Sequence, residues 1–182
     1  MMYKLQHEIY SIPKLKFYRK AFKDQIDIGR CLRDRYISNS DYESFNSRSC
    51  NELDGFIQFA SDVGYELYAT TSGTLIDDKS NVILFNVIND RAYYSIASLL
   101  IKIWLYGKYS VQRSELDFAA ATASEMMCPY DSLIYDICQY NSRNEDLISS
   151  VTLGSMYHVG NEFINVKVKR MGIENMITVV SR

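Results

Sequence analysis

The sequence predicts an α+β fold in which a small three-stranded sheet packs against several helices. Three observations predict this class. Apolar residues recur at helical spacing over most of the chain, strand-like runs replace them between Tyr65 and Val87, and the stretch Ala92–Gly107 is apolar on nearly every side. At 182 residues, the chain fits one domain with a sizeable core.

The first 50 residues are expected to form a helical arm. Apolar residues from Lys14 to Ile37 lie loosely at helical spacing, which predicts one helix over this stretch. Its end is basic, where cations suit the helix dipole. The stretch Ser38–Cys50 is rich in Ser, Asn and Asp, which is typical of a loop.

Residues 51–142 are expected to form the core. Asn51 can cap a helix that ends at Gly64. The mostly apolar strand Asn81–Val87 is expected to be central, preceded by two strands that pair through a turn at Ser72-Gly73. Those two strands are Tyr65–Thr71 and Thr74–Asp77. Three helices follow over Ala92–Gly107 (capped by Asn89-Asp90), Ser114–Met127 and Tyr130–Tyr140.

Residues 143–182 are expected to form a helix pair and a tail. The pattern predicts a short helix, a turn at Val159-Gly160 and a helix over Asn161–Met171, an order similar to a helix-turn-helix. The segment Ile173–Ser181 is predicted to close the fold as a strand.

Composition narrows the function classes. The formal net charge is −2 and the isoelectric point is about 5.7, which argues against a general polyanion-binding protein because neutralising phosphates requires a basic face. The four cysteines include no C-x-x-C pair, so neither a disulfide framework nor a zinc knuckle is indicated. No secretory signal and no apolar run of about 18 residues are visible, so we expect a cytoplasmic protein that does not bind a membrane.

Two phrases in the second half of the chain resemble those of a known family. Ala119–Pro129 (AAATASEMMCP) resembles A-N-x-F-A-A-E-L-L-M-P, and Leu133 lies where a leucine usually follows the proline. Leu153–Ile173 resembles a second phrase that ends in R-L-x-x-L-G-I. Together with the order of elements, they resemble the ImmA/IrrE family of zinc metallopeptidases, small bacterial and phage proteins that cleave repressors. The resemblance covers roughly Leu53–Ile173 and implies a zincin-like metallopeptidase scaffold.

The residues that bind zinc in that family are replaced in this chain. The family's helix after the third strand carries His-Glu-x-x-His, whose histidines hold zinc and whose glutamate deprotonates the bound water. These positions correspond to Ser98, Leu99 and Lys102, and the glutamate ligand of the next helix corresponds to Leu116, with Glu115 adjacent. A serine is a poor zinc ligand, an ammonium repels the ion and a leucine cannot accept a proton. We therefore expect no metal and no other cofactor.

Lys102 is the one charged residue in the long apolar helix, so its ammonium needs a partner or access to water. One hypothesis pairs it with Glu115 or Asp117 near the vacated metal position; the alternative is that its four-carbon stem reaches the surface. A third hypothesis is an enzyme whose active site uses Lys102, Glu115 or Cys128 in place of zinc. It predicts a cavity around Lys102 into which several polar groups point. Cys128 is otherwise expected to be a packed thiol, and Glu125 a solvated helix residue.

Two groups of cations are candidates for contact with DNA or a partner. Lys167, Lys169 and Arg170 lie on the last predicted helix, where helix-turn-helix proteins contact the major groove. DNA binding predicts that all three share one exposed face. The second group consists of Arg30, Arg33 and Arg35. For both groups, the alternative is a solvated helix surface that contacts no partner.

These observations favour a catalytically inactive metallopeptidase-like protein that acts by binding another protein. The resemblance implies that the partner is a repressor or another transcription regulator of a phage or mobile element. The 15 tyrosines favour a binding role, because tyrosine is enriched at protein interfaces. A binding function of this kind predicts a packed core around Lys102 and an exposed apolar patch elsewhere on the surface. The alternatives are an enzyme with a rebuilt site around Lys102 and a small DNA-binding regulator that uses the C-terminal helix pair.

Overall fold

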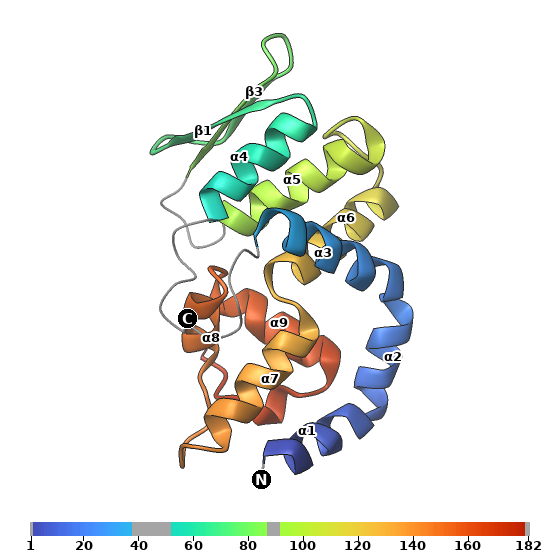
Figure 1. Ribbon diagram of the computed structural model, residues 1–182, viewed down its shortest axis with the longest axis vertical. Coiled ribbons are helices and arrows are strands. Elements are labelled where there is room, and N and C mark those ends of the chain that lie inside the picture. Colours follow the sequence, from blue (N-terminus) through green and yellow to red (C-terminus); the bar gives the residue numbers. More distant parts are fainter. Residues whose placement is uncertain (1, 38–51, 87–91, 181–182) are drawn as a thin grey trace.

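The computed structural model describes residues 2–37, 52–86 and 92–180 (Figure 1). The helices are α1 (Met2–Ser11), α2 (Pro13–Ala21), α3 (Lys23–Tyr36), α4 (Glu52–Asp62), α5 (Ala92–Tyr106), α6 (Arg113–Met127), α7 (Tyr130–Asn141), α8 (Ser150–Met156) and α9 (Asn161–Met171). The strands are β1 (Glu66–Thr70), β2 (Leu75–Asp77) and β3 (Val82–Asn86), and η1 (Glu174–Met176) is a 3-10 turn. The predicted α+β class is confirmed. The predicted loop Ser38–Cys50 and the predicted caps at Asn51 and Asn89-Asp90 lie outside the described residues.

The sheet has the strand order β1-β3-β2, so the apolar strand β3 is central, as predicted. β1 runs parallel to β3 and β2 runs antiparallel to it. The predicted pairing of the first two strands through Ser72-Gly73 is therefore wrong. The tight connection instead joins β2 to β3, where Asn81 adopts a φ of 54° and Asp77 accepts hydrogen bonds from the Lys79 N–H and the Ser80 hydroxyl. Asp and Asn favour such turns because their side chains bond nearby backbone groups and tolerate positive φ.

Among the described elements, helices cover one face of the sheet and none packs on the other. α4 packs on β1 and α5 packs on β3 (Figure 1). As its sequence predicts, α5 is a central helix whose buried residues occupy several sides, and Gly107 ends it with a φ of 66°. No helix in the described part of the chain, α5 included, is both long and apolar enough to cross a bilayer.

The N-terminal segment is helical, as predicted, but it is two helices where the sequence predicts one over Lys14–Ile37. The backbone of Phe22 leaves the helical region, with a φ of −112° and a ψ of 25°, and separates α2 from α3. α1 packs on α7, α2 on α9, and α3 on both α4 and α6. Residues 2–36 therefore extend along one side of the molecule, from the neighbourhood of the sheet to the opposite end (Figure 1).

The close crossing of α3 and α6 depends on Gly29. A Cβ atom at this position would lie 2.7 Å from the Cβ of Glu125 and 2.8 Å from the carbonyl oxygen of Thr122. Both contacts are shorter than van der Waals separation, and the second is with backbone that cannot move aside without distorting α6. Glycine therefore allows the two helices to approach here.

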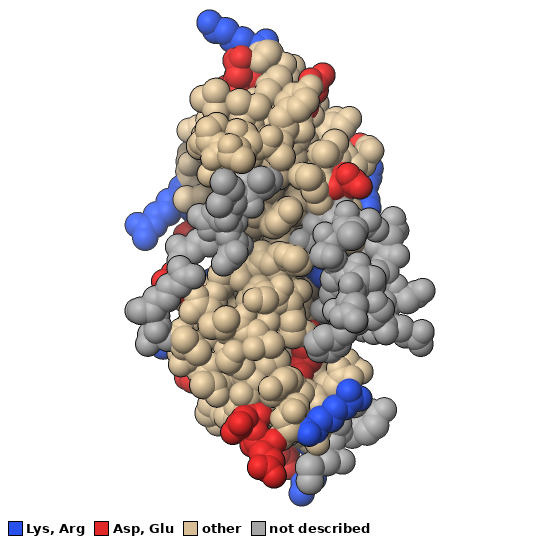
Figure 2. Space-filling model, turned by 90° about the vertical axis from the view of Figure 1, so that its left-hand side faces the viewer, with Lys and Arg blue, Asp and Glu red and all other residues tan. Residues whose placement is uncertain are grey.

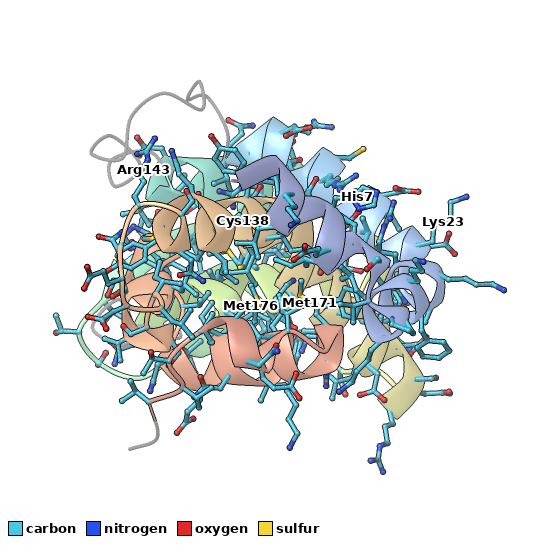
Figure 3. All side chains as sticks on the ribbon, turned by 90° about the horizontal axis from the view of Figure 1, so that it is seen from below. His7, Lys23, Cys138, Arg143, Met171 and Met176 are labelled. Carbon is cyan, nitrogen blue, oxygen red and sulfur yellow. The ribbon has the colours of Figure 1, made fainter. Side chains whose placement is uncertain are left out.

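The predicted C-terminal helix pair is confirmed, whereas the predicted strand over Ile173–Ser181 is wrong. After Gly172, with a φ of 75°, the chain forms η1 and then a single bridge between Ser149 and Thr178 rather than a strand of a sheet. Viewed from below, Cys138, Met171 and Met176 lie toward the interior between α7 and α9 (Figure 3). The C-terminal segment thus completes the core at the end opposite the sheet.

Candidate functional site

The positions that correspond to the zinc ligands lie on α5 and α6, which pack against each other. Leu99 is buried, Ser98 is half-buried and Leu116 is 42% exposed. Glu115 belongs to a capping box at the start of α6, where its carboxylate accepts a hydrogen bond of 2.7 Å from the Gln112 N–H. Among the residues described, no three His, Cys, Asp or Glu side chains are grouped as ligands of one metal ion. Glu115 therefore stabilises a helix end, and loss of the metal site stays a prediction from the sequence.

Lys102 does not form the predicted pair with Glu115 or Asp117. Of the ion pairs between described residues, none involves Lys102. Its side chain is partly exposed, and burial of the rest lowers the pKa of its ammonium. This environment agrees with the alternative in which the stem of Lys102 packs on the helix surface and its head reaches water.

The three arginines of α3 bind three different parts of the molecule. Arg30 pairs with Asp131 of α7 at 2.5 Å, and Arg35 pairs with Asp62 of α4 at 2.8 Å. Arg33 donates hydrogen bonds to two carbonyl oxygens at the C-terminal end of α6, at 2.9 and 3.0 Å. Such carbonyls have no partner within their own helix. Each guanidinium has an intramolecular acceptor, so these arginines join helices. Contact of Arg30, Arg33 and Arg35 with DNA or a partner stays a prediction.

Lys167 is buried, so its predicted place on an exposed DNA-contacting face is wrong. Its side chain is 3% exposed, and its Nζ lies 2.5 Å from Oε1 of Glu125, a side chain that is 1% exposed. Nζ also donates to the carbonyl oxygen and Oγ of Ser124, both at 3.2 Å, so each ammonium hydrogen has an acceptor. Lys169 and Arg170 are exposed. α9 therefore presents two exposed cations, where the DNA-binding alternative predicts three.

Glu125 is the centre of a buried network, and the prediction that it is solvated is wrong. The Tyr18 hydroxyl of α2 donates to Oε1 at 2.5 Å, and the Tyr130 N–H donates to Oε2 at 3.0 Å. The second bond satisfies a free N–H at the start of α7, where Pro129 provides no side-chain cap. Burial, and then the charge of Glu125, raise the pKa of the Tyr18 phenol well above its ordinary value. One carboxylate thus joins α2, α6, α7 and α9.

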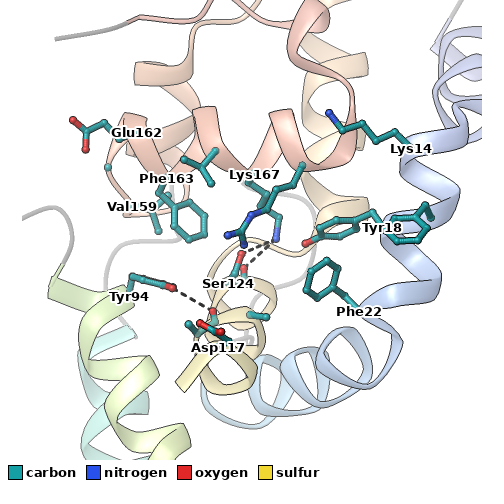
Figure 4. A pocket seen from close by; sticks show the side chains of 16 residues that line it. Lys14, Tyr18, Phe22, Tyr94, Asp117, Ser124, Val159, Glu162, Phe163 and Lys167 are labelled. Atoms are coloured by element: carbon teal, nitrogen blue, oxygen red, sulfur yellow. Dashed lines mark hydrogen bonds between the residues drawn. The ribbon is translucent and has the colours of Figure 1, made fainter. Parts of the chain in front are cut away.

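A cavity of about 830 Å³ lies beside this network, between α2, α6 and α9 (Figure 4). Phe17 and Val166, which are 71% and 52% exposed, border it on the solvent side. A volume in the range of about 300–1,000 Å³ is typical of small-molecule sites. Lys102 does not line this cavity. Most of the lining is aromatic or aliphatic: Phe17, Tyr18, Phe22, Tyr94, Ala120, Ala121, Val159, Phe163 and Val166.

Four charged residues besides Lys167 line the cavity: Lys14, Asp117, Glu162 and Arg170. Arg170 forms no hydrogen bond or ion pair with any residue that the structure describes. Its charge acts to lower the pKa values of both Tyr18 and Tyr94, which burial raises. Arg170, Tyr18 and Tyr94 all line the cavity, from α9, α2 and α5.

Cys128 is packed, as predicted, and is unsuited to be a nucleophile. Its side chain is 0% exposed, and burial raises the pKa of its thiol to about 12. At neutral pH the thiol stays protonated, whereas nucleophilic catalysis requires the thiolate. An enzyme that uses Cys128 would need an environment that lowers this pKa.

The face of the sheet on which no described helix packs carries an apolar row across all three strands. On the side of the molecule that Figure 2 shows, charged side chains are sparse over much of the upper part, the end at which the sheet lies. Leu84 of β3 is paired in register with Tyr68 of β1 on one side and with Leu75 of β2 on the other. Tyr68 is 52% exposed and Leu75 is 58% exposed. On the opposite face, the neighbouring cross-strand row contains buried Leu67 and Ile83, which pack into the core. We call the row Tyr68–Leu84–Leu75 the outer row.

Comparison with known proteins gives no match: no family model, no curated protein and no solved structure matches this chain.

Sequence reasoning placed the candidate site on α5, whereas the cavity and the buried network lie around α6 and α9. One signal for Glu125 was present, because Ala119–Cys128 is otherwise a mainly apolar stretch and a charge within it needs a partner if the stretch is buried. The partner, Lys167, lies 42 residues further along the chain. No local pattern connects the two.

Proposed function

We propose that this protein is a non-catalytic binding protein that acts by binding another protein on the outer row of its sheet. The observation that carries this proposal is the exposure of Tyr68 and Leu75 on either side of Leu84. Exposed apolar patches of this kind are typical of interaction sites, because association removes their surface from water. An exposed apolar patch away from Lys102 is also what the favoured protein-binding function predicts from the sequence.

The charges beside the outer row indicate the chemistry of the partner. Glu66 and Asp77 flank Val82 in the next cross-strand row on the same face. Hydrogen bonds from the Ser80 hydroxyl and the Lys79 N–H lower the pKa of Asp77, so its carboxylate is ionised at neutral pH. A partner that places an apolar side chain on the outer row and a basic side chain beside it complements this surface.

The resemblance to ImmA/IrrE proteins supports the kind of partner that we propose. Those peptidases must recognise the repressors that they cleave, and a chain with Ser98, Leu99 and Lys102 in place of the zinc motif retains no chemistry for cleavage there. We accordingly propose a repressor or another regulator of a phage or mobile element as the partner, bound on a metallopeptidase-like scaffold. Lys167, buried in its pair with Glu125, removes support from DNA binding as a second candidate.

The experiment compares two substitutions at apolar positions of similar exposure. Leu75 lies in the outer row and is 58% exposed, whereas Val151 lies on α8 and is 48% exposed. Affinity purification with quantitative mass spectrometry is done from cells of the source organism, with the wild type, Leu75→Asp and Val151→Asp as baits. We expect one protein to be captured by the wild type and by Val151→Asp but not by Leu75→Asp. Once purified, this partner should bind the wild type and Val151→Asp with similar affinity and Leu75→Asp much more weakly. If Leu75→Asp binds it as tightly as the wild type does, the outer row is not the interface.

Metal analysis tests the non-catalytic part of the proposal. The native protein, purified without added zinc, is expected to contain well below one equivalent of zinc by elemental analysis, because Ser98, Leu99 and Lys102 supply no adequate ligand. Near-stoichiometric zinc would contradict the proposal and reopen a peptidase function.

A further inference from the structure

We propose that the cavity between α2, α6 and α9 binds a small organic monoanion with a long apolar body, whose negative group pairs with Arg170. This ligand site is separate from the outer row, and the inference does not depend on the proposed protein partner. It rests on the volume, the lining and the charges of the cavity.

The volume and lining indicate a largely apolar ligand. At about 830 Å³, the cavity can hold a molecule of many non-hydrogen atoms. The rings of Phe17 and Phe22, from α2 and its C-terminal end, and of Phe163 and the side chain of Val166, both from α9, line the space. Figure 4 shows Phe22 and Phe163 on two sides of it. An apolar chain between these side chains gains free energy in proportion to the area that it removes from water.

The cations of the cavity indicate that the ligand is an anion. The ammonium of Lys167 already has three acceptors within the protein, so it has no hydrogen left to donate. Arg170 has no partner among the described residues, and its five N–H donors match a carboxylate in a bidentate arrangement. Lys14, also exposed and also lining the cavity, adds a second positive charge from α2. Arg170 is the best-placed donor for the anionic group.

The acids of the cavity indicate that the ligand carries one negative group and not two. Glu162 and Arg170 lie eight positions apart on α9, which is about 12 Å along a helix axis. Asp117 of α6 also lines the cavity. An anion at Arg170 can extend its apolar body along α9, but a second anion at the far end of that body would approach Glu162. The cavity should therefore discriminate against a dianion of the same length.

Calorimetric titration with four probes of equal chain length tests this inference. The probes are dodecanoate, dodecanedioate, dodecylammonium and dodecanol, each below the concentration at which it aggregates. We expect dodecanoate to bind the full-length protein with one-to-one stoichiometry and the other three to bind at least about tenfold more weakly, because they add a second anion, reverse the charge or lack it. If dodecylammonium or dodecanol binds as tightly as dodecanoate, or if dodecanoate does not bind, the inference is wrong.

Two adjacent cations on α9 provide a matched pair of variants. Arg170→Gln removes the charge that faces the cavity, whereas Lys169→Gln removes an exposed charge that does not line it. A charge-assisted hydrogen bond predicts about tenfold or more weakening of dodecanoate binding by Arg170→Gln, against less than about twofold by Lys169→Gln. Equal weakening by both variants would indicate general electrostatic attraction and overturn the assignment to Arg170. Both side chains are exposed and neither forms a hydrogen bond or ion pair with a described residue, so we expect both variants to fold.

Discussion

Glu125 and Lys167 show how much of a single residue's role depends on distant parts of the chain. Isolated in the sequence, each is a charged residue on an amphipathic helix, for which a solvated position is the usual assignment. In the folded protein, both side chains are almost completely inaccessible and bind each other at 2.5 Å. Residue types and spacing predicted the helices that carry these two residues. They could not predict the pair, because its members lie 42 residues apart and meet only where the side chain of Lys167 reaches from α9 to α6.

Removing one member of this pair should be costly. Lys167→Met leaves the carboxylate of Glu125 buried without its cation, and we expect the free energy of unfolding to fall by about 3–5 kcal/mol. The measurement is urea denaturation of the wild type and the variant at pH 7. Lys169→Met, an exposed change on the same helix, should alter stability by less than about 0.5 kcal/mol. The double variant Glu125→Gln, Lys167→Met should recover part of the loss, because it removes the unpaired buried charge while the amide oxygen can still accept a hydrogen bond from Tyr18 or Tyr130; a double variant less stable than Lys167→Met would contradict this account.

Ionisation of the Tyr18 phenol should lower the free energy of unfolding in alkaline solution. Its pKa is raised in the native state by burial and by Glu125, so above pH of about 10 the unfolded chain loses this phenolic proton while the native chain keeps it. The unfolded state then binds fewer protons, and stability decreases as the pH rises. Tyr18→Phe removes this contribution and should lose less stability between pH 9 and 11 than the wild type does, although it is less stable at pH 7. An unchanged slope in denaturation measured across this pH range would show that Tyr18 does not titrate as the structure predicts.

At the scale of elements, most boundaries followed from the sequence, and the errors share a cause. Amphipathic spacing, Gly107 and Pro129 located α5, α6 and α7 within a residue or two. Strand pairing was predicted wrongly because both Ser72-Gly73 and the polar residues before Asn81 favour a turn, and local chemistry does not say which strands meet across it. The break at Phe22 was missed because its apolar neighbours continue the helical pattern through it.

The contact between α3 and α6 provides a test at this scale. Gly29→Ala inserts a Cβ 2.8 Å from the Thr122 carbonyl oxygen, and we expect it to destabilise the protein by about 1–3 kcal/mol, as overpacked sites do. Gly73→Ala is the matched control, because nothing lies within 4 Å of the added atom there. Thermal unfolding followed by circular dichroism compares the two. Equal melting temperatures for both variants would show that α3 and α6 do not approach as closely as the structure has them.

At the scale of the whole molecule, α6 is the element on which the others converge. α3 and α5 pack against it, Arg33 binds its C-terminal carbonyls, and Glu125 links it to α2, α7 and α9. β2, in contrast, is a short edge strand with exposed or half-buried residues. Amphipathic patterns predicted the class of this fold. They did not predict that α6 would contact segments so far apart in the chain.

Amide hydrogen exchange should reflect this arrangement. We expect the amides of the buried part of α6, around Ala123 and Met126, to exchange only when the whole protein unfolds, and those of β2 to exchange through local opening at much higher rates. Exchange followed by mass spectrometry resolves the two segments. Comparable rates in α6 and β2 would contradict the central position of α6.

The network around Glu125 also constrains the order in which the chain can reach its native state. Tyr18 and Glu125 are 107 residues apart in the sequence, and Lys167 follows 42 residues after Glu125. During synthesis, Glu125 emerges from the ribosome before its cation exists, and a carboxylate without a counter-charge resists entry into an apolar interior. We therefore expect native packing of α2, α6 and α7 to require α9. Prematurely terminated chains that end before Lys167 would stay open, and proteases could distinguish them from the finished product.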